Sequence, residues 1–67
     1  MIKLNVRMIN DEGIVLEYDT DVDSKEDFID NMSKGIRDNI PIIINGEDVS
    51  NIINPSRITA IQIKETK

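Results

Sequence analysis

The sequence predicts an α+β fold, with one helix packed on one face of a four- or five-stranded mixed or antiparallel sheet. Near the start of the chain, apolar and polar residues alternate, as in a half-buried strand. A central segment repeats apolar residues at helical spacing. Fourteen of the 67 residues are isoleucine, a β-branched residue that favours strands. The expected order is β-β-α-β-(β)-β in one domain over residues 1–67, where the bracketed strand is a short return over residues 49–53.

The first two strands are expected to form a hairpin. The turn lies at residues 10–13, where Gly13 can take a positive φ. The second strand covers residues 14–18 and places Ile14, Leu16 and Tyr18 on the core face, and the chain then leaves the sheet from Asp19. The first strand is predicted from the alternation of four apolar residues: Ile2, Leu4, Val6 and Met8.

The helix is expected to begin at Asp23 or Ser24, because each is followed three residues later by an acid, as in a capping box. Pro41 disfavours helical geometry at the residue before it, so the helix ends by about Asp38. Four apolar residues at helical spacing form the stripe that faces the sheet: Phe28, Ile29, Met32 and Ile36.

The second half of the chain contains the remaining strands. Residues 42–44 are three isoleucines, typical of an internal strand covered on both faces. Asn45-Gly46 predicts a turn, and residues 49–53 return as the short strand. The last strand covers residues 58–64, where Ile58 is out of step with later isoleucines, which predicts a bulge near Thr59.

Composition excludes several classes of function. The chain has no cysteine and no histidine, which removes thiol chemistry, histidine catalysis and the usual zinc ligands. A formal net charge of −5 and two aromatic residues argue against nucleic acid as a ligand. No segment is long and apolar enough to span a bilayer and no secretory signal stands at the start, so a cytoplasmic location is expected. We therefore expect no enzyme activity, no cofactor and no membrane partner.

The acidic stretch from Asp19 to Asp30 resembles a calcium loop in its spacing, with carboxylates at Asp19, Asp21, Asp23, Asp27 and Asp30. Ser24 occupies the position where such a loop needs glycine, and the last ligand is aspartate rather than glutamate. We interpret the stretch as a strand exit, a helix cap and an acidic helix face. It is at most a weak calcium candidate, and no metal site is predicted.

The same stretch carries the charge imbalance of the chain, with six acids and one base. Such a cluster is either a solvated face or a surface that steers a basic partner. In the second case Val22 is the apolar anchor. The predicted partner-binding residues are Asp19, Asp21, Val22, Glu26, Asp27 and Asp30. Arg57, beside Asn54 and Ser56, is either an ordinary surface arginine or a site for an anion or a partner carboxylate.

Two resemblances accompany these patterns. The hairpin, helix and next strand in residues 1–45 resemble the order of elements in β-grasp domains. The ubiquitin-like and sulfur-carrier members of that family act through a C-terminal Gly-Gly tail. The sequence here ends Glu65-Thr66-Lys67, so we do not expect that chemistry. The segment Ile52 to Ile58, with Ile61 and Ile63 after it, resembles the ends of small uncharacterised proteins of phages and mobile elements in Gram-positive bacteria.

The expected function is a non-enzymatic protein–protein interaction module, and the second resemblance implies a phage or mobile-element accessory factor that modulates a host protein. The alternative is a structural, self-assembling small protein whose role is its oligomer. A homodimer is expected as well. One helix covers one face of a sheet, and Val15, Ile58 and residues 42–44 suggest apolar surface elsewhere.

Overall fold

The computed structural model describes residues 1–66 and has an α+β fold. Its elements are β1 (Ile2–Asn10), β2 (Val15–Val22), α1 (Lys25–Arg37), β3 (Ile42–Asn45), β4 (Ser50–Ile53), the 3-10 turn η1 (Pro55–Arg57) and β5 (Ile58–Thr66). The predicted order of elements is confirmed, including the short return strand. The single sheet of four or five strands is not formed, because the strands divide into a three-stranded sheet, β2-β1-β5, and a separate hairpin, β3-β4. All three strand pairings are antiparallel.

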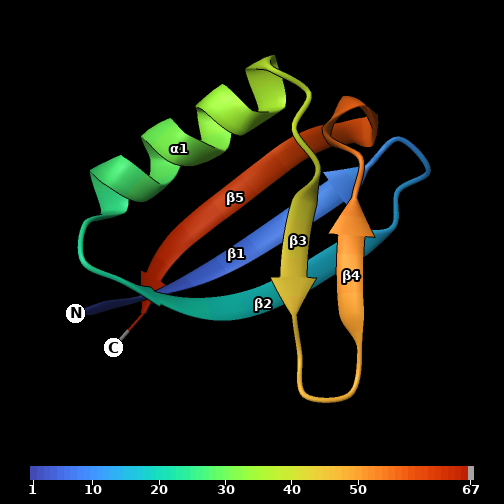
Figure 1. The fold of residues 1–67 in the computed structure, drawn as a ribbon. Coiled ribbons are helices and arrows are strands. Elements are labelled where there is room, and N and C mark those ends of the chain that lie inside the picture. The colour runs from blue at the N-terminus through green and yellow to red at the C-terminus, as the bar shows by residue number, and fades with distance from the viewer. Residues whose placement is uncertain (67) are drawn as a thin grey trace.

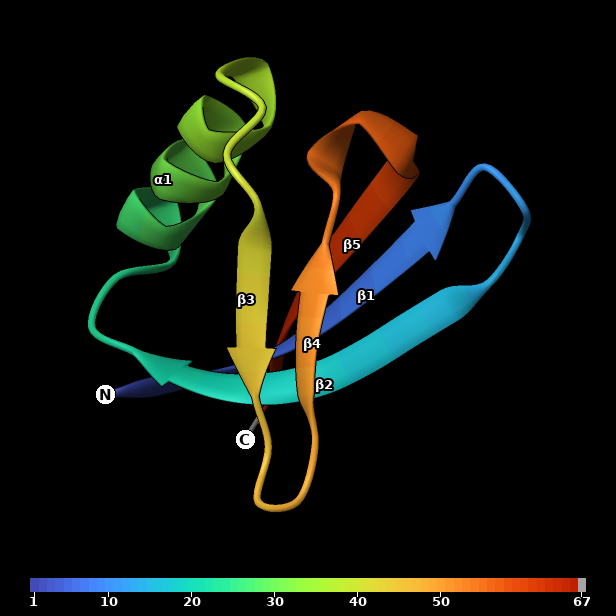
Figure 2. The same ribbon diagram turned by 45° about the vertical axis from the view of Figure 1, so that its right-hand side comes forward.

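The hairpin β3-β4 and helix α1 lie over the same face of the three-stranded sheet, which we call the core face (Figures 1 and 2). Ile42, Ile44 and Ile53 point from the hairpin onto the buried core, and Phe28 and Met32 do so from the helix. Stacking the hairpin on the sheet buries the inner side chains of both its strands. Pairing at a sheet edge would leave them exposed, so burial of apolar surface favours the stacked arrangement.

The core is centred on β1, the middle strand of the sheet, where Leu4, Val6 and Met8 are buried. In β2, Leu16 and Tyr18 face the same side, as expected, because they lie opposite Met8 and Val6.

Two expectations for this region are wrong. Ile14 precedes the strand, is 61% exposed, and its backbone N–H donates to the side chain of Asn10 in the turn. The chain also stays in the sheet to Val22 instead of leaving at Asp19. Thr20 and Val22 continue the inward-facing row, so the alternation of the strand persists through the acidic residues.

The helix and the bulge agree with the sequence. Ser24 is the N-cap, and its hydroxyl oxygen accepts a hydrogen bond from the N–H of Asp27 at 3.2 Å. Helix α1 ends at Arg37. Between the pairs Ile9–Ala60 and Asn10–Ile58 the register shifts, so that Thr59 is the extra residue of a bulge. No helix within residues 1–66 is long and apolar enough to cross a membrane.

Candidate functional site

The predicted partner-binding residues occupy two separate surfaces. Asp19 and Asp21 point to the face of the sheet opposite α1 and the hairpin, which we call the open face. The carboxylate of Asp19 accepts a hydrogen bond from the side chain of Asn5 at 2.9 Å. The other three acids, Glu26, Asp27 and Asp30, are exposed on α1. The structure therefore divides the acidic stretch between the open face and the helix.

Val22, the proposed anchor, faces inward and packs partly buried against the core cluster. It also lines a shallow hollow of about 330 Å³ at the start of α1, together with Asp23, Asp27 and Phe28. Asp19 and Asp21 do not line this hollow. The hollow beside Val22 is thus bordered by the acids at the start of α1, Asp23 and Asp27, and not by Asp19 and Asp21 of the open face.

The five aspartates of the calcium candidate are dispersed for the same reason. Asp19 and Asp21 lie on the open face of β2, whereas Asp27 and Asp30 belong to a helix that begins after Ser24. Within residues 1–66, no three acidic side chains form a group that could hold a metal ion.

The open face is polar and carries both signs of charge. Along β1 and β2, Lys3 lies opposite Asp21 and Arg7 lies opposite Glu17. Opposite charges in such cross-strand pairs contribute up to about 1 kcal/mol each. Val15 is the exposed apolar residue of β2 on this face, while Ile58 packs against the core on the other. Apolar surface on the open face is therefore confined to one end of the sheet, where Val15, Ile9 and Ala60 lie opposite one another across the three strands.

The outer surface of the hairpin β3-β4 is apolar. Ile43 and Ile52 lie directly opposite each other and are 61% and 74% exposed. Val49, in the turn between the strands, is exposed as well. The expectation that residues 42–44 are covered on both faces is wrong, because nothing within residues 1–66 covers Ile43. Successive side chains of a strand point to opposite faces, so Ile43 points away from the face that Ile42 and Ile44 share. The run of three isoleucines did not reveal that this second face is left uncovered.

A hollow of about 490 Å³ separates β3 from β2 and α1. Its apolar lining includes Phe28, Met32 and Ile43, and Asp19 contributes from β2. Tyr18 also lines it, and burial raises the pKa of its phenol above the ordinary value of 10.0. The phenol is therefore neutral at physiological pH and can serve as a hydrogen-bonding group there.

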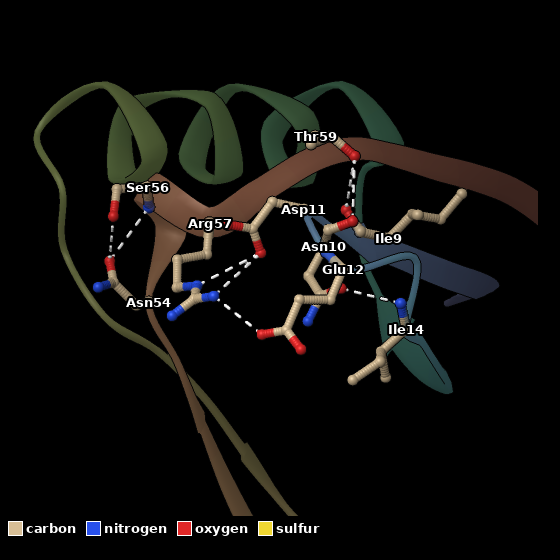
Figure 3. A network of polar contacts seen from close by, with 9 residues as sticks. All are labelled: Ile9, Asn10, Asp11, Glu12, Ile14, Asn54, Ser56, Arg57 and Thr59. Carbon is tan, nitrogen blue, oxygen red and sulfur yellow. Dashed lines mark hydrogen bonds and ion pairs between the residues drawn. The ribbon is translucent and has the colours of Figure 1, made fainter.

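Arg57 is held by carboxylates of its own chain (Figure 3). Its guanidinium donates to Asp11 at 3.3 Å and to Glu12 at 2.9 Å, both in the turn between β1 and β2. Asn54 caps η1 by accepting hydrogen bonds from the N–H and hydroxyl of Ser56. The arginine thus fastens two loops together, and any external carboxylate would compete with two internal ones.

No family model matches this chain, and no curated protein or solved structure is similar enough to count as a match.

Proposed function

We propose that this chain is a non-enzymatic protein–protein interaction module that binds a basic partner protein. The observation that carries the proposal is the exposed pair of Ile43 and Ile52 on the outer face of the hairpin. This apolar pair adjoins the acidic strand β2, because Ile43 and Asp19 line the same hollow.

The apolar part supplies the contact. Two large apolar side chains directly opposite each other form a continuous exposed patch, which commonly marks an interaction site. Burying one such side chain fully contributes about 1.5–3 kcal/mol. The adjacent hollow of about 490 Å³ has room for an apolar side chain of the partner, as in interfaces with a buried anchor.

The acidic part selects the partner. Glu47 and Asp48 lie in the turn of the hairpin. Asp19 borders the adjacent hollow from the edge strand β2, while its carboxylate points to the open face and adds to the acidic charge of that strand. Apolar contact surrounded by charged residues is the usual anatomy of an interface. With a net charge of −5, the chain attracts a basic protein and repels an acidic one, so the charge acts chiefly on the association rate.

The resemblance of residues 52–63 to proteins of phages and mobile elements supports an accessory factor that acts on a host protein. Such a factor works by stoichiometric binding and needs no catalytic group. The alternative, a structural protein whose role is its oligomer, predicts large assemblies of the chain alone.

The test is affinity capture from a lysate of the host, followed by binding kinetics with the purified partner. The double variant Ile43→Ser/Ile52→Ser should raise the dissociation constant at least tenfold, which corresponds to about 1.4 kcal/mol. Asp19→Asn should slow association and reduce its dependence on salt. Asp38→Asn, at the end of α1, is the matched control that removes one charge far from β2.

Equal binding by the parent and the double variant would refute the hairpin as the contact surface. Assemblies of many copies that capture no other protein would favour the structural alternative.

A further inference from the structure

We propose that two copies of this chain dimerise through antiparallel pairing of their β5 strands, with the two α1 helices antiparallel across the same two-fold axis. The inference does not depend on the proposed function, because the edge of β5 and the outer face of the hairpin β3-β4 are different surfaces. It rests on the strand edge, the groove beside it and the charges along both.

Strand β5 has a free edge. It spans nine residues, Ile58–Thr66, and among the strands of residues 1–66 it pairs with β1 alone. Residues 58–63 contain no charge and no proline. The bulge at Thr59 and the charges of Lys64 and Glu65 lie towards the two ends of β5, so the unprotected part of the edge is its middle, residues 60–63. An edge of that kind readily pairs with another strand.

The groove of about 300 Å³ beside this edge runs between β5 and α1. Ala60 and Ile61, which point to opposite faces of the sheet, both line it, so the edge of the strand forms one wall. The helix supplies the other wall through Ile29, Met32, Ser33 and Ile36. A strand added at the β5 edge would place its inward apolar side chains in this groove.

The opposite edge of the sheet, β2, is protected against the same pairing. Its outward row carries Glu17, Asp19 and Asp21 at alternate positions. Suppose that β2 pairs in antiparallel fashion with β2 of a second copy, and that the two-fold axis lies anywhere from Glu17 to Asp21. Two of these acids then lie directly opposite each other. Like charges in that position destabilise the pair. A dimer formed through β5 therefore does not add further copies, because both of its remaining sheet edges are acidic β2 strands.

Strand β5 is complementary to a second copy of itself. Directly opposite residues in an antiparallel pair point to the same face. A two-fold axis at Gln62 therefore places Ile61 opposite Ile63 of the second copy, on the helix side. Lys64 then lies opposite Ala60 of the second copy, so no like charges meet.

Helix α1 has the matching complementarity. Glu26, Asp30, Ser33 and Arg37 follow at spacings of four, three and four residues, and so lie along one side of the helix. Ser33 of this row lines the groove. In an antiparallel arrangement, the acidic end of one helix faces the basic end of the other, with Glu26 near Arg37 of the second copy. At the middle, Asp30 lies opposite Ser33 of the second copy, whose small side chain allows close approach. The two Asp30 carboxylates near the axis offset part of the attraction between the helix ends. These opposite charges favour a second copy over an unrelated strand.

The test uses light scattering coupled to gel filtration at tens of micromolar, with the full chain. The parent should be a dimer. Gln62 is exposed on the open face, so charged variants there leave the core unchanged. Gln62→Glu and Gln62→Lys each place two like charges at the two-fold axis. Each should raise the dimer dissociation constant at least about fivefold. An equimolar mixture of the two should restore the dimer as a mixed species.

One control and one charge exchange test whether the dimer uses β5 and α1. Ile43→Ser/Ile52→Ser should leave the dimer intact, because it alters the hairpin alone. Glu26→Arg and Arg37→Glu should each weaken the dimer, and the two together should restore it. Circular dichroism and thermal melting verify that each variant is folded.

A monomeric parent would overturn the proposal. So would a dimer that tolerates both Gln62 variants, or one that is lost in the hairpin variant. Failure of folded Gln62→Glu and Gln62→Lys to associate on mixing would exclude symmetric pairing at this position, and would instead favour a partner's extended segment as the occupant of the groove.

Discussion

Asp11 and Arg57, which are 46 residues apart in the sequence, bind each other through the backbone and also through their side chains, the latter shown in Figure 3. The backbone N–H of Asp11 donates to the carbonyl oxygen of Arg57 at 2.8 Å, and the guanidinium of Arg57 donates to the carboxylate of Asp11 at 3.3 Å. This double connection holds the turn of the first hairpin against η1 and the start of β5.

The side-chain part of this connection should contribute little to stability. The side chains of Arg57 and Asp11 are 54% and 48% exposed, and ion pairs of that kind contribute about 0–1 kcal/mol. In a double-mutant cycle of Asp11→Ala and Arg57→Ala, measured by urea unfolding, the coupling should stay below about 1 kcal/mol and diminish in high salt. A coupling above about 2 kcal/mol would show that the pair acts as a buried one.

Ser24→Ala should lower the free energy of unfolding by about 1 kcal/mol, because the N–H of Asp27 loses its capping partner. For a domain of this size, that loss lowers the melting temperature by roughly 4–8 °C. The matched control is Asp23→Ala, which changes the other capping candidate and should have a smaller effect. If Asp23→Ala proved the more damaging, the assigned cap would be incorrect.

Two glycines should respond in opposite ways to alanine. At Gly46, an added Cβ would lie 2.7 Å from the carbonyl oxygen of Val49, so Gly46→Ala should distort the hairpin turn and destabilise the protein. At Gly35, within α1, a Cβ meets nothing within 4 Å. Gly35→Ala should therefore stabilise the protein by up to about 1 kcal/mol, since alanine is the better helix former. Thermal melting of the two variants checks both signs.

Tyr18 should make the protein sensitive to alkaline pH. Burial raises the pKa of its phenol above 10.0 in the folded state, so the unfolded chain loses this proton at a lower pH than the folded protein. The free energy of unfolding should therefore fall as the pH rises from the unfolded pKa of about 10 to the higher folded one.

Spectrophotometric titration of the phenol, together with unfolding at several alkaline pH values, measures this effect. Tyr18→Phe should remove its contribution to the pH dependence. A titration midpoint at or below 10 in the folded protein would contradict the burial of the phenol.

Local patterns in the sequence were sufficient for most of the secondary structure. Alternation predicted β1, the acids after Asp23 and Ser24 predicted the helix start, and the displaced isoleucine predicted the bulge at Thr59. These features depend on neighbouring residues, namely the period of a strand or the reach of a capping side chain. The same patterns left open whether Asp23 or Ser24 is the cap, because both offer a side-chain oxygen at the helix start.

The placement of the candidate surfaces depends on contacts between distant parts of the chain. β2 continues to Val22 because β1 provides a partner as far as Ile2, which holds Asp19 and Asp21 on the open face. The hairpin stacks on the sheet because Leu4, Val6 and Met8 offer apolar surface there, and this leaves Ile43 and Ile52 outside. Which faces become covered depends on how much apolar surface all the elements can bury together. The sequence of a single strand or helix does not show which other element will pack against it.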